Sequence, residues 1–378
     1  MSDVLQETRI KMQSVAKHQA ELSNYNCAII ATVGFGKGKV MLDIAQELIS
    51  KYNIKRILYA CDSERLRDSI EDGFPSEIEK WGNSKLKKMI TLECYQTCSK
   101  WKNEEFDLLL ADEADFSMTP VYSNLYFNNK FKFKILVTGT LSSDKKKILQ
   151  QIVPITFKLT TNQAEDLGII NKTSYYVYNY KLSDDESVMY NKLSAKIFRK
   201  IQEEDKNGER FFIGKRREFL FTLDSSYFHC RKIMKWLWSQ NKKTRLIVFC
   251  QRTEQADRVC KYSYHGKNES LDNIRKFQNE EISACSVVSK IKRGINLRNA
   301  NAGIFESFDG STTEFEQRNG RLKRLPQYLF ATVIFMIPWV KKTDNKTGKE
   351  YYKETIVADW LHKCTANIKD INLIDLKL

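Results

Sequence analysis

The feature that most constrains the fold is a series of short apolar, β-rich runs separated by amphipathic segments of helical length. In the first half of the chain these runs are Cys27–Val33, Arg56–Ala60, Met89–Cys94, Phe106–Ala111 and Lys134–Val137. In the second half they are Arg245–Cys250, Ala284–Val288, Ala302–Phe305 and Phe330–Ile337. Continuous apolar runs of this length are typical of strands that are buried on both faces of a parallel sheet. Their alternation with helices predicts an α/β fold of two parallel sheets, each flanked by helices.

A stretch of different character separates the two groups of runs. It contains the tyrosine-rich pattern Tyr175–Tyr180, which predicts a strand, and a helix that would begin at a capping box formed by Ser183–Glu186. The chain has 378 residues, which is room for two ordinary domains. We expect a first lobe over residues 1–170, a connecting region over 171–240 and a second lobe over 241–378.

Composition narrows the class of protein and its partners. The net charge of +15 favours a polyanionic partner, although an excess of this size also occurs in chains that are simply well solvated. Nine cysteines, an odd number, argue against a disulfide framework and for a reducing compartment. The N-terminus lacks the apolar stretch of a secretory signal, and the longest apolar run, Ala331–Pro338, is too short to span a bilayer. We therefore expect a cytoplasmic protein with no membrane partner.

A glycine-rich segment follows the first apolar run and precedes a helix-length segment, Val40–Tyr52. Backbone N–H groups in such a turn approach phosphates closely, and the helix N-terminus adds partial positive charge. We expect Lys37 to reach the β- and γ-phosphates, and the candidate nucleotide-binding residues are Thr32, Gly34, Gly36, Lys37, Gly38 and Lys39. Position 38 normally carries a Ser or Thr that ligates Mg²⁺, so Thr32 or water would have to replace that ligand. The alternative is a plain glycine turn with an incidental lysine.

A carboxylate cluster, Asp112–Asp115, ends the apolar run Phe106–Ala111. We expect Asp112 to hold Mg²⁺, through water, with Glu113 beside it in the same metal site. Glu113 would orient and deprotonate the attacking water, because phosphoryl transfer needs both carboxylates at the end of one strand. Asp115 would link the site to the rest of the lobe. The alternative is a solvated acidic turn, which is common at strand ends.

A basic segment, Glu316–Arg324, lies in the second lobe. Arg321 and Arg324 are three residues apart, so they would share one face of a helix. Guanidinium groups offer paired donors to phosphate oxygens and would stabilise the transferring γ-phosphoryl group, as arginine fingers do. The alternative is a basic helix that faces solvent or nucleic acid.

These segments resemble the signature motifs of superfamily-2 helicases. Ala31–Lys37 and Asp112–Asp115 are similar to the first two motifs, and Glu316–Arg324 matches the sixth at its defining positions. The match implies catalytic roles for Gln317, Arg321 and Arg324. Val137–Leu141 is similar to the third motif, which implies coupling between hydrolysis and lobe movement. Arg9–Gln13 is similar to the family's Arg/Gln element, which implies that Gln13 reads the adenine edge, unless this is an ordinary polar helix.

The resemblance also implies contacts to a nucleic acid strand. In the family, loops that contact the nucleic acid strand lie at the positions of Tyr59–Arg65 and Cys94–Thr97, although the sequences of these segments differ from the usual motifs. Arg245–Cys250 resembles the fourth motif and Val288–Asn296 the fifth. The residues implied as nucleic-acid contacts are Arg65, Gln96, Thr97, Lys290 and Arg293. The basic segments Lys215–Arg217 and Lys341–Lys353 would widen this contact surface or would simply be solvated loops.

The wording of the motifs favours one branch of this superfamily. The Asp-Glu-Ala-Asp spelling suggests RNA-remodelling DEAD-box proteins, but the third and sixth motifs do not follow that pattern. Asp166–Ile170 and Leu182–Tyr190 look like the inter-lobe connection of type III restriction, chromatin-remodelling and phage branch-migration motors. The resemblance therefore implies two tandem RecA-like domains that hydrolyse ATP with Mg²⁺ at the cleft between the lobes. We expect a monomeric motor that prefers DNA over RNA. The alternatives are an RNA helicase of the same architecture and, because of Gly38, a pseudo-motor that binds nucleic acid without turnover.

Overall fold

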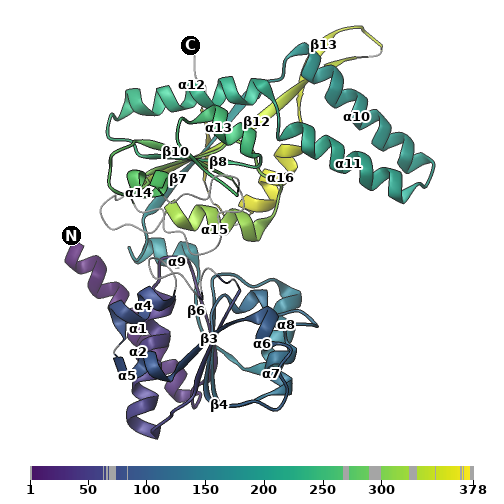
Figure 1. Cartoon of the computed structure of the whole chain (residues 1–378). Helices are drawn as coiled ribbons and strands as arrows, with labels where there is room; N and C mark the ends of the chain where they lie inside the picture. The colour runs from purple at the N-terminus through teal and green to yellow at the C-terminus, as the bar shows by residue number, and fades with distance from the viewer. Residues whose placement is uncertain are drawn as a thin grey trace. The chain divides into compact units, whose positions relative to one another are not determined.

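The computed structural model describes residues 2–62, 64, 67, 74–82, 84–266, 272–288, 299–322, 330–344, 346–366, 368 and 370–374. Within this part the chain forms two compact units, one built from residues up to Lys172 and the other from Thr173 onward. Each unit is a sheet of mainly parallel strands with helices on its faces, which confirms the predicted α/β fold (Figure 1).

The first unit is organised around a six-stranded sheet of the order β3-β2-β4-β5-β1-β6. Every pairing in it is parallel. Its strands are β1 (Asn26–Ala31), β2 (Ile57–Cys61), β3 (Ile90–Cys94), β4 (Glu105–Ala111), β5 (Lys130–Thr138) and β6 (Ile155–Leu159). Five of these strands coincide with the apolar runs of the first half of the sequence, within a few residues at each end.

Helices cover both faces of the first sheet. One face packs on α1 (Ser2–Leu22), α2 (Lys37–Tyr52), α4 (Phe74–Trp81), α5 (Ser84–Met89) and α9 (Thr161–Asp166). The other packs on α6 (Tyr95–Cys98), the 3₁₀ turn η1 (Ala114–Phe116), α7 (Asn124–Asn128) and α8 (Ser143–Ile152). Alternate residues of each strand belong to the two cores, as Ile29 and Ala28 of β1 do. Burial on both faces explains why these strands read as continuous apolar runs.

The order of the strands brings the predicted motifs to one edge of the first sheet. Because all the strands are parallel, the residues that follow their carboxyl ends meet at the same edge. β5 lies between β1 and β4, so the segment after Thr138 separates the glycine-rich loop after Ala31 from the carboxylates after Ala111. This edge is the usual position of a ligand site in an open α/β sheet.

The second unit contains an eight-stranded sheet of the order β14-β7-β12-β11-β8-β10-β9, with β13 paired to β12. β13 is antiparallel to β12, whereas the pairs among β8 to β12 and the β14–β7 pair are parallel. The strands are β7 (Lys172–Lys181), β8 (Leu246–Cys250), β9 (Ser263–Tyr264), β10 (Ala284–Val288), β11 (Ala302–Phe305), β12 (Phe330–Thr343), β13 (Glu350–Glu354) and β14 (Ile371–Leu373).

Three helices of the second unit come from the stretch of sequence between the two groups of apolar runs. The helices of this unit are α10 (Asp184–Gln202), α11 (Lys206–Leu220), α12 (Asp224–Gln240), α13 (Thr253–Val259), α14 (Asp272–Gln278), α15 (Thr312–Leu322) and α16 (Ile356–Thr365). The predicted capping box begins α10: the Ser183 hydroxyl accepts from the backbone N–H of Glu186, whose carboxylate accepts from the N–H of Ser183. Residues 171–240, expected as a connecting region, hold β7, α10, α11 and α12, and from Thr173 they group with the second unit. Among the described helices, none is both long and apolar enough to cross a bilayer.

Candidate nucleotide site

The predicted phosphate loop, residues 32–36, connects β1 to α2 in a conformation that requires glycine. Gly34 and Gly36 have φ angles of +91° and +90°, which side chains with a Cβ rarely adopt. A Cβ on Gly36 would also lie 2.5 Å from Nε2 of Gln13. The loop conformation therefore requires glycine at both positions, and at Gly36 the amide of Gln13 also leaves no room for a Cβ. The loop leads directly into the N-terminus of α2.

Gln13 on α1 contacts the backbone of this loop. It is buried, and its Nε2 donates to the carbonyl oxygen of Phe35 at 2.7 Å. Phe35 is fully buried and stacks on Phe157 of β6 with ring centroids 5.5 Å apart. Arg9 donates from Nη2 to the carbonyl oxygen of Ile169 at 2.7 Å, which fixes α1 against the end of the unit. The observed role of Gln13 is to shape the loop, and its reading of adenine stays a prediction.

The candidate lysines of the loop differ in their surroundings. Lys37 is the first residue of α2, and its Nζ donates to the carbonyl oxygen of Ala31 at 3.2 Å. The same Nζ would lie 3.7 Å from a Cβ on Gly139, so the lysine head lies over the end of β5. Lys39 instead pairs with Asp43 at 2.5 Å and lies over the ring of Trp81. Lys37 is thus the loop lysine that points toward the carboxylates.

Thr32 does not supply a free hydroxyl in this arrangement. Its Oγ1 lies 3.0 Å from Oγ1 of Thr161 on α9, and the residue is buried. The notion that Thr32 replaces the ligand missing at position 38 stays a prediction, but its hydroxyl already has a partner.

Asp112 lies at the carboxyl end of β4, where three groups orient it. Its Oδ2 accepts from the hydroxyl of Tyr59 at 2.9 Å, and its Oδ1 accepts from the backbone N–H of Glu113 at 2.9 Å. The hydroxyl of Tyr95 donates to its carbonyl oxygen at 2.7 Å. Burial raises the pKa of Asp112 above that of an ordinary aspartate, the negative charge of Glu113 adds to this effect, and the ammonium of Lys37 opposes it. Asp112 and Lys37 are therefore electrostatic neighbours across the end of β5.

Glu113 holds an unusual backbone conformation. Its φ and ψ are +45° and +49°, the left-handed region, which costs a residue with a side chain about 1–3 kcal/mol. Strain of this kind persists where the surrounding structure imposes it, and here η1 begins at the next residue with Phe116 N–H donating to the carbonyl oxygen of Glu113 at 2.9 Å. The turn directs the chain away from the sheet edge directly after the two carboxylates.

Asp115 makes the predicted link between the carboxylate cluster and the rest of the unit. It is buried, its Oδ1 accepts from the hydroxyl of Thr138 at 3.0 Å, and its Oδ2 pairs with Nζ of Lys145 at 3.3 Å. Thr138 is the last residue of β5 and belongs to the segment that resembles the third helicase motif. The second and third motifs are therefore joined by a hydrogen bond inside the first unit.

The residues that orient Asp112 were missed by the sequence reasoning. Tyr59 lies in the middle of β2 and Tyr95 directly follows β3. Both are buried, so phenylalanine would fill either position equally well. The tyrosine hydroxyl itself is the signal in the sequence, because a buried tyrosine hydroxyl needs a hydrogen-bond partner such as Asp112.

The predicted nucleic-acid contacts fall partly inside the described structure. Gln96 and Thr97 lie on α6, directly after β3, and both are exposed. Nε2 of Gln96 donates to the carbonyl oxygen of Asp62 at 3.2 Å. Arg65, Lys290 and Arg293 lie outside the described residues. Gln96 and Thr97 therefore occupy the same sheet edge as the phosphate loop, at the far strand.

The arginine motif of the second unit lies on α15, which packs against β11. A Cβ on Gly303 would lie 2.3 Å from Cδ1 of Leu322, so this close approach needs glycine in the strand. Asn319 donates from Nδ2 to the hydroxyl of Tyr175 on β7 at 2.7 Å. Gln317 and Arg321 are on the same helix, whereas Arg324 lies outside the described residues. Their catalytic roles stay predictions.

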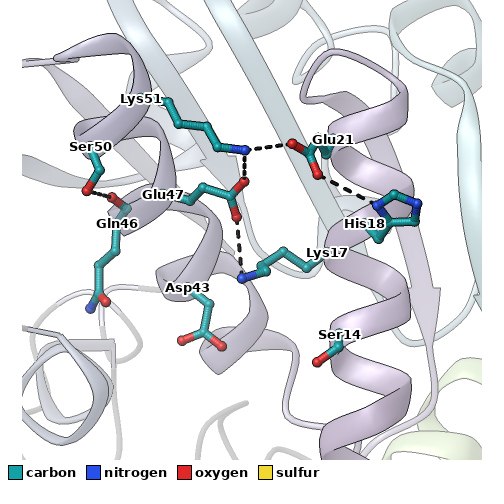
Figure 2. A pocket seen from close by; sticks show the side chains of 9 residues that line it. All are labelled: Ser14, Lys17, His18, Glu21, Asp43, Gln46, Glu47, Ser50 and Lys51. Carbon is teal, nitrogen blue, oxygen red and sulfur yellow. Dashed lines mark hydrogen bonds and ion pairs between the residues drawn. The ribbon is translucent and has the colours of Figure 1, made fainter.

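A separate groove lies between α1 and α2 and contains none of the predicted nucleotide-binding residues (Figure 2). Glu47 of α2 accepts from Lys51 at 2.6 Å and pairs with Lys17 of α1 at 3.4 Å, and Lys51 also bonds Glu21 of α1 at 2.6 Å. These ion pairs tie the two helices together, so the groove is a packing feature of the helices that support the phosphate loop.

The protein has two sheets of mainly parallel strands, and the first has a glycine-lysine loop and paired carboxylates at its carboxyl edge. These features are typical of RecA-like units. Two family models match: the res subunit of type III restriction enzymes over residues 4–143, and the helicase conserved C-terminal domain over residues 229–326. The chain belongs to the superfamily-2 helicases and resembles the type III restriction subunits within them. The resemblance inferred from the motifs is thereby confirmed, and use of ATP and of nucleic acid follows from the family.

Solved structures show the same fold at low sequence identity. The helicase domain of Hef from Pyrococcus furiosus is 13% identical with a TM-score of 0.52, and the match covers 86% of this chain and 94% of that one. The type ISP restriction-modification enzyme LlaBIII is 14% identical with a TM-score of 0.61, covering 96% of this chain and 31% of the enzyme. Dbp5 from S. cerevisiae is 12% identical with a TM-score of 0.58, covering 96% and 89%. No curated protein matches the chain.

Proposed function

We propose that this protein is a DNA translocase or helicase that hydrolyses ATP at the carboxyl edge of the first sheet. The observation that carries the proposal is the meeting of Lys37 and Asp112 at the two sides of β5, close enough for the lysine charge to act on the carboxylate. A cation for the phosphates and a carboxylate for a metal ion are the pair that phosphoryl transfer needs.

The residues at this edge fit a nucleotide-bound magnesium ion. Asp112 is a carboxylate held in place by Tyr59 and by the N–H of Glu113, and hard oxygen ligands are the ones that Mg²⁺ prefers. The loop beside it has glycine at two left-handed positions, Gly34 and Gly36, and leads into the N-terminus of α2. When bound, the ion would neutralise charge on the phosphates.

Each residue of the first unit has one task in the proposed reaction. The loop N–H groups and Lys37 bind the phosphates, and Asp112 holds the ion. Glu113 orients a water molecule whose oxygen attacks the γ-phosphorus, and its carboxylate takes the proton. The bond between the γ-phosphorus and the β,γ-bridging oxygen then breaks, which gives ADP and inorganic phosphate.

The second unit is proposed to contribute Arg321 and Arg324 to the same reaction. These two roles are proposed because the sequence Glu316–Arg324 matches the sixth motif of the family. Guanidinium groups can also stabilise the negative charge that develops on the transferring phosphoryl group. The choice of DNA rests on the family model of the type III restriction subunit and on the net charge of +15. Among proteins with this fold, LlaBIII is bound to DNA and Dbp5 to RNA, so RNA remains the alternative substrate.

The test is phosphate release from ATP, measured with single-stranded DNA, duplex DNA, forked DNA and RNA as separate activators. We expect stimulation that is strongest with DNA and that disappears in Glu113→Gln. Stronger stimulation by RNA would replace DNA as the substrate. Hydrolysis that no polynucleotide stimulates would refute the proposed motor, and hydrolysis that persists in Glu113→Gln would refute the assignment of the site.

A further inference from the structure

Position 38 is glycine instead of the expected serine or threonine, and the carboxylate of Glu77 fills the space of the missing side chain. Gly38 is the second residue of α2, where a Ser or Thr hydroxyl would usually meet the metal ion. A Cβ built on Gly38 would lie 1.5 Å from Oε2 of Glu77, 2.5 Å from its Cδ and 2.9 Å from its Oε1. The first of these distances is about that of a covalent carbon–oxygen bond. A carboxylate oxygen of Glu77 therefore lies about one bond length from where the Cβ of a residue at position 38 would be, in the space that a serine or threonine side chain would take.

The helix that carries Glu77 is held firmly beside the phosphate loop. α4 packs on α2, and its residues Phe74 and Ile78 are buried in the same core as the inner face of α2. Phe74 also stacks on Tyr59 with ring centroids 3.5 Å apart. Tyr59 in turn donates to Asp112. The packing that positions Glu77 thus belongs to the same contacts that position the carboxylate on β4.

Electrostatics places Glu77 near Asp112 as well. Burial is the largest cause of the raised pKa of Asp112 and of Tyr59, and the negative charge of Glu77 adds a smaller contribution to both shifts. The carboxylates of Glu77, on α4, and of Asp112, directly after β4, therefore both lie near the start of α2, with Lys37 as the nearby cation. Magnesium in nucleotide sites is typically held by one or two carboxylates together with phosphate oxygens and water.

We propose that Glu77 replaces the missing hydroxyl of position 38 as a ligand of the nucleotide-bound magnesium ion, either directly or through a water molecule. The proposal rests on the nucleotide site proposed above, and adds a residue that no helicase motif in this sequence contains. It concerns an ion that takes most of its ligands from phosphate and water. In the described part of the chain no three His, Cys, Asp or Glu side chains form a metal-binding group by themselves.

A carboxylate in this place has an effect that a hydroxyl would not have. With the metal ion present, its negative charge attracts the ion. Without the ion, the same charge repels the phosphates of the nucleotide. Glu77 should therefore strengthen metal binding and weaken metal-free nucleotide binding, which makes the site strictly dependent on the metal.

The experiment compares Glu77→Gln with Glu79→Gln, an exposed glutamate on the same helix. Two quantities are measured on the full chain: the affinity for Mn²⁺ in the complex with a non-hydrolysable ATP analogue, by electron paramagnetic resonance, and the affinity for a fluorescent ATP analogue in EDTA. For Glu77→Gln we expect Mn²⁺ affinity to fall about 10- to 100-fold and metal-free nucleotide affinity to rise. Glu79→Gln should match the wild type in both, and thermal unfolding checks that both variants fold.

A second variant distinguishes a lost ligand from a disturbed helix. In Gly38→Ser combined with Glu77→Ala, the new hydroxyl occupies the vacated space, and we expect Mn²⁺ affinity to recover relative to Glu77→Ala alone. Equal Mn²⁺ and metal-free affinities in Glu77→Gln and Glu79→Gln would overturn the role of Glu77 while leaving the nucleotide site intact. A wild-type chain that binds no nucleotide with any metal would overturn the proposed function, and Glu77's role with it.

Discussion

Replacing Gly36 by alanine should destabilise the first unit by about 2–3 kcal/mol, and the structure gives two separate reasons. First, the φ of Gly36 is +90°, and a left-handed conformation costs a residue with a Cβ roughly 1–2 kcal/mol. Second, the new Cβ would lie 2.5 Å from Nε2 of Gln13. Gln13 would have to move away and give up its hydrogen bond to the carbonyl oxygen of Phe35, which is worth about 1 kcal/mol.

The assay is thermal unfolding of the full chain. For a unit of this size, about 2–3 kcal/mol corresponds to a fall in Tm of roughly 4–12 °C in the transition of the first unit. The matched control is Gly214→Ala in the middle of α11, where a Cβ meets nothing within 4 Å. Because alanine favours the helix over glycine, that variant should be stabilised by about 1 kcal/mol. The two glycine-to-alanine changes are thus expected to have opposite signs.

A double-mutant cycle separates the two reasons. Gln13→Ala removes the amide that the new Cβ would meet, so Gly36→Ala should cost less in that background, close to the backbone contribution alone. Strict additivity of the two changes would show that Gln13 does not touch the loop. A change in Tm of under 1 °C for Gly36→Ala would refute the conformation inferred for the phosphate loop itself.

Three further predictions concern other parts of the two units. Thr138→Val removes the hydroxyl that donates to buried Asp115, so it should destabilise the chain by about 1.5–3 kcal/mol. It should also reduce the stimulation of ATP hydrolysis by nucleic acid more than it reduces nucleotide affinity. Phosphate release measures the first quantity and nucleotide titration the second. Glu306 is buried and its pKa is raised by that burial. Its folded form therefore holds the proton more tightly than the unfolded form, and stability falls as pH rises from the unfolded to the folded pKa; Tm measured across this range should fall less in Glu306→Gln, and parallel curves would contradict the shift. Arg321→Ala should slow hydrolysis about a thousandfold or more while the Kd of a non-hydrolysable analogue stays within a few-fold, and a parallel loss of binding would argue against a transition-state role.

Much of the fold follows from the sequence because its strands are buried on both faces. Runs such as Ala302–Phe305 have no polar residue to confuse with a helix face, and the corresponding strand β11 has the same bounds. β6 was missed because Thr156 and Lys158 interrupt its apolar residues. The edge strand β13 is not predicted because its residues are mostly exposed and polar, and β14 is not predicted because three residues are too few to form a pattern. Edge pairing depends on the neighbour that a strand meets, and this is a tertiary property.

The candidate site divides in the same way. The positions of Lys37, Asp112 and Asp115 at one edge of the sheet could be predicted because each closely follows a strand in the sequence. Glu77 could not, since its place beside Gly38 depends on how α4 packs on α2, and nothing in Phe74–Trp81 marks one glutamate over the other. The one signal in the sequence was indirect: the glycine at position 38 left a ligand to be supplied from elsewhere.

Displacement of a third strand from a DNA triplex tests directly whether hydrolysis at the first-unit site drives movement on DNA. With duplex DNA flanking the triplex, we expect the wild type to displace the third strand with ATP and not with a non-hydrolysable analogue. Glu113→Gln should bind the same DNA and displace nothing. Phosphate release without displacement, or displacement that does not need ATP, would show that hydrolysis at this site does not drive movement on DNA.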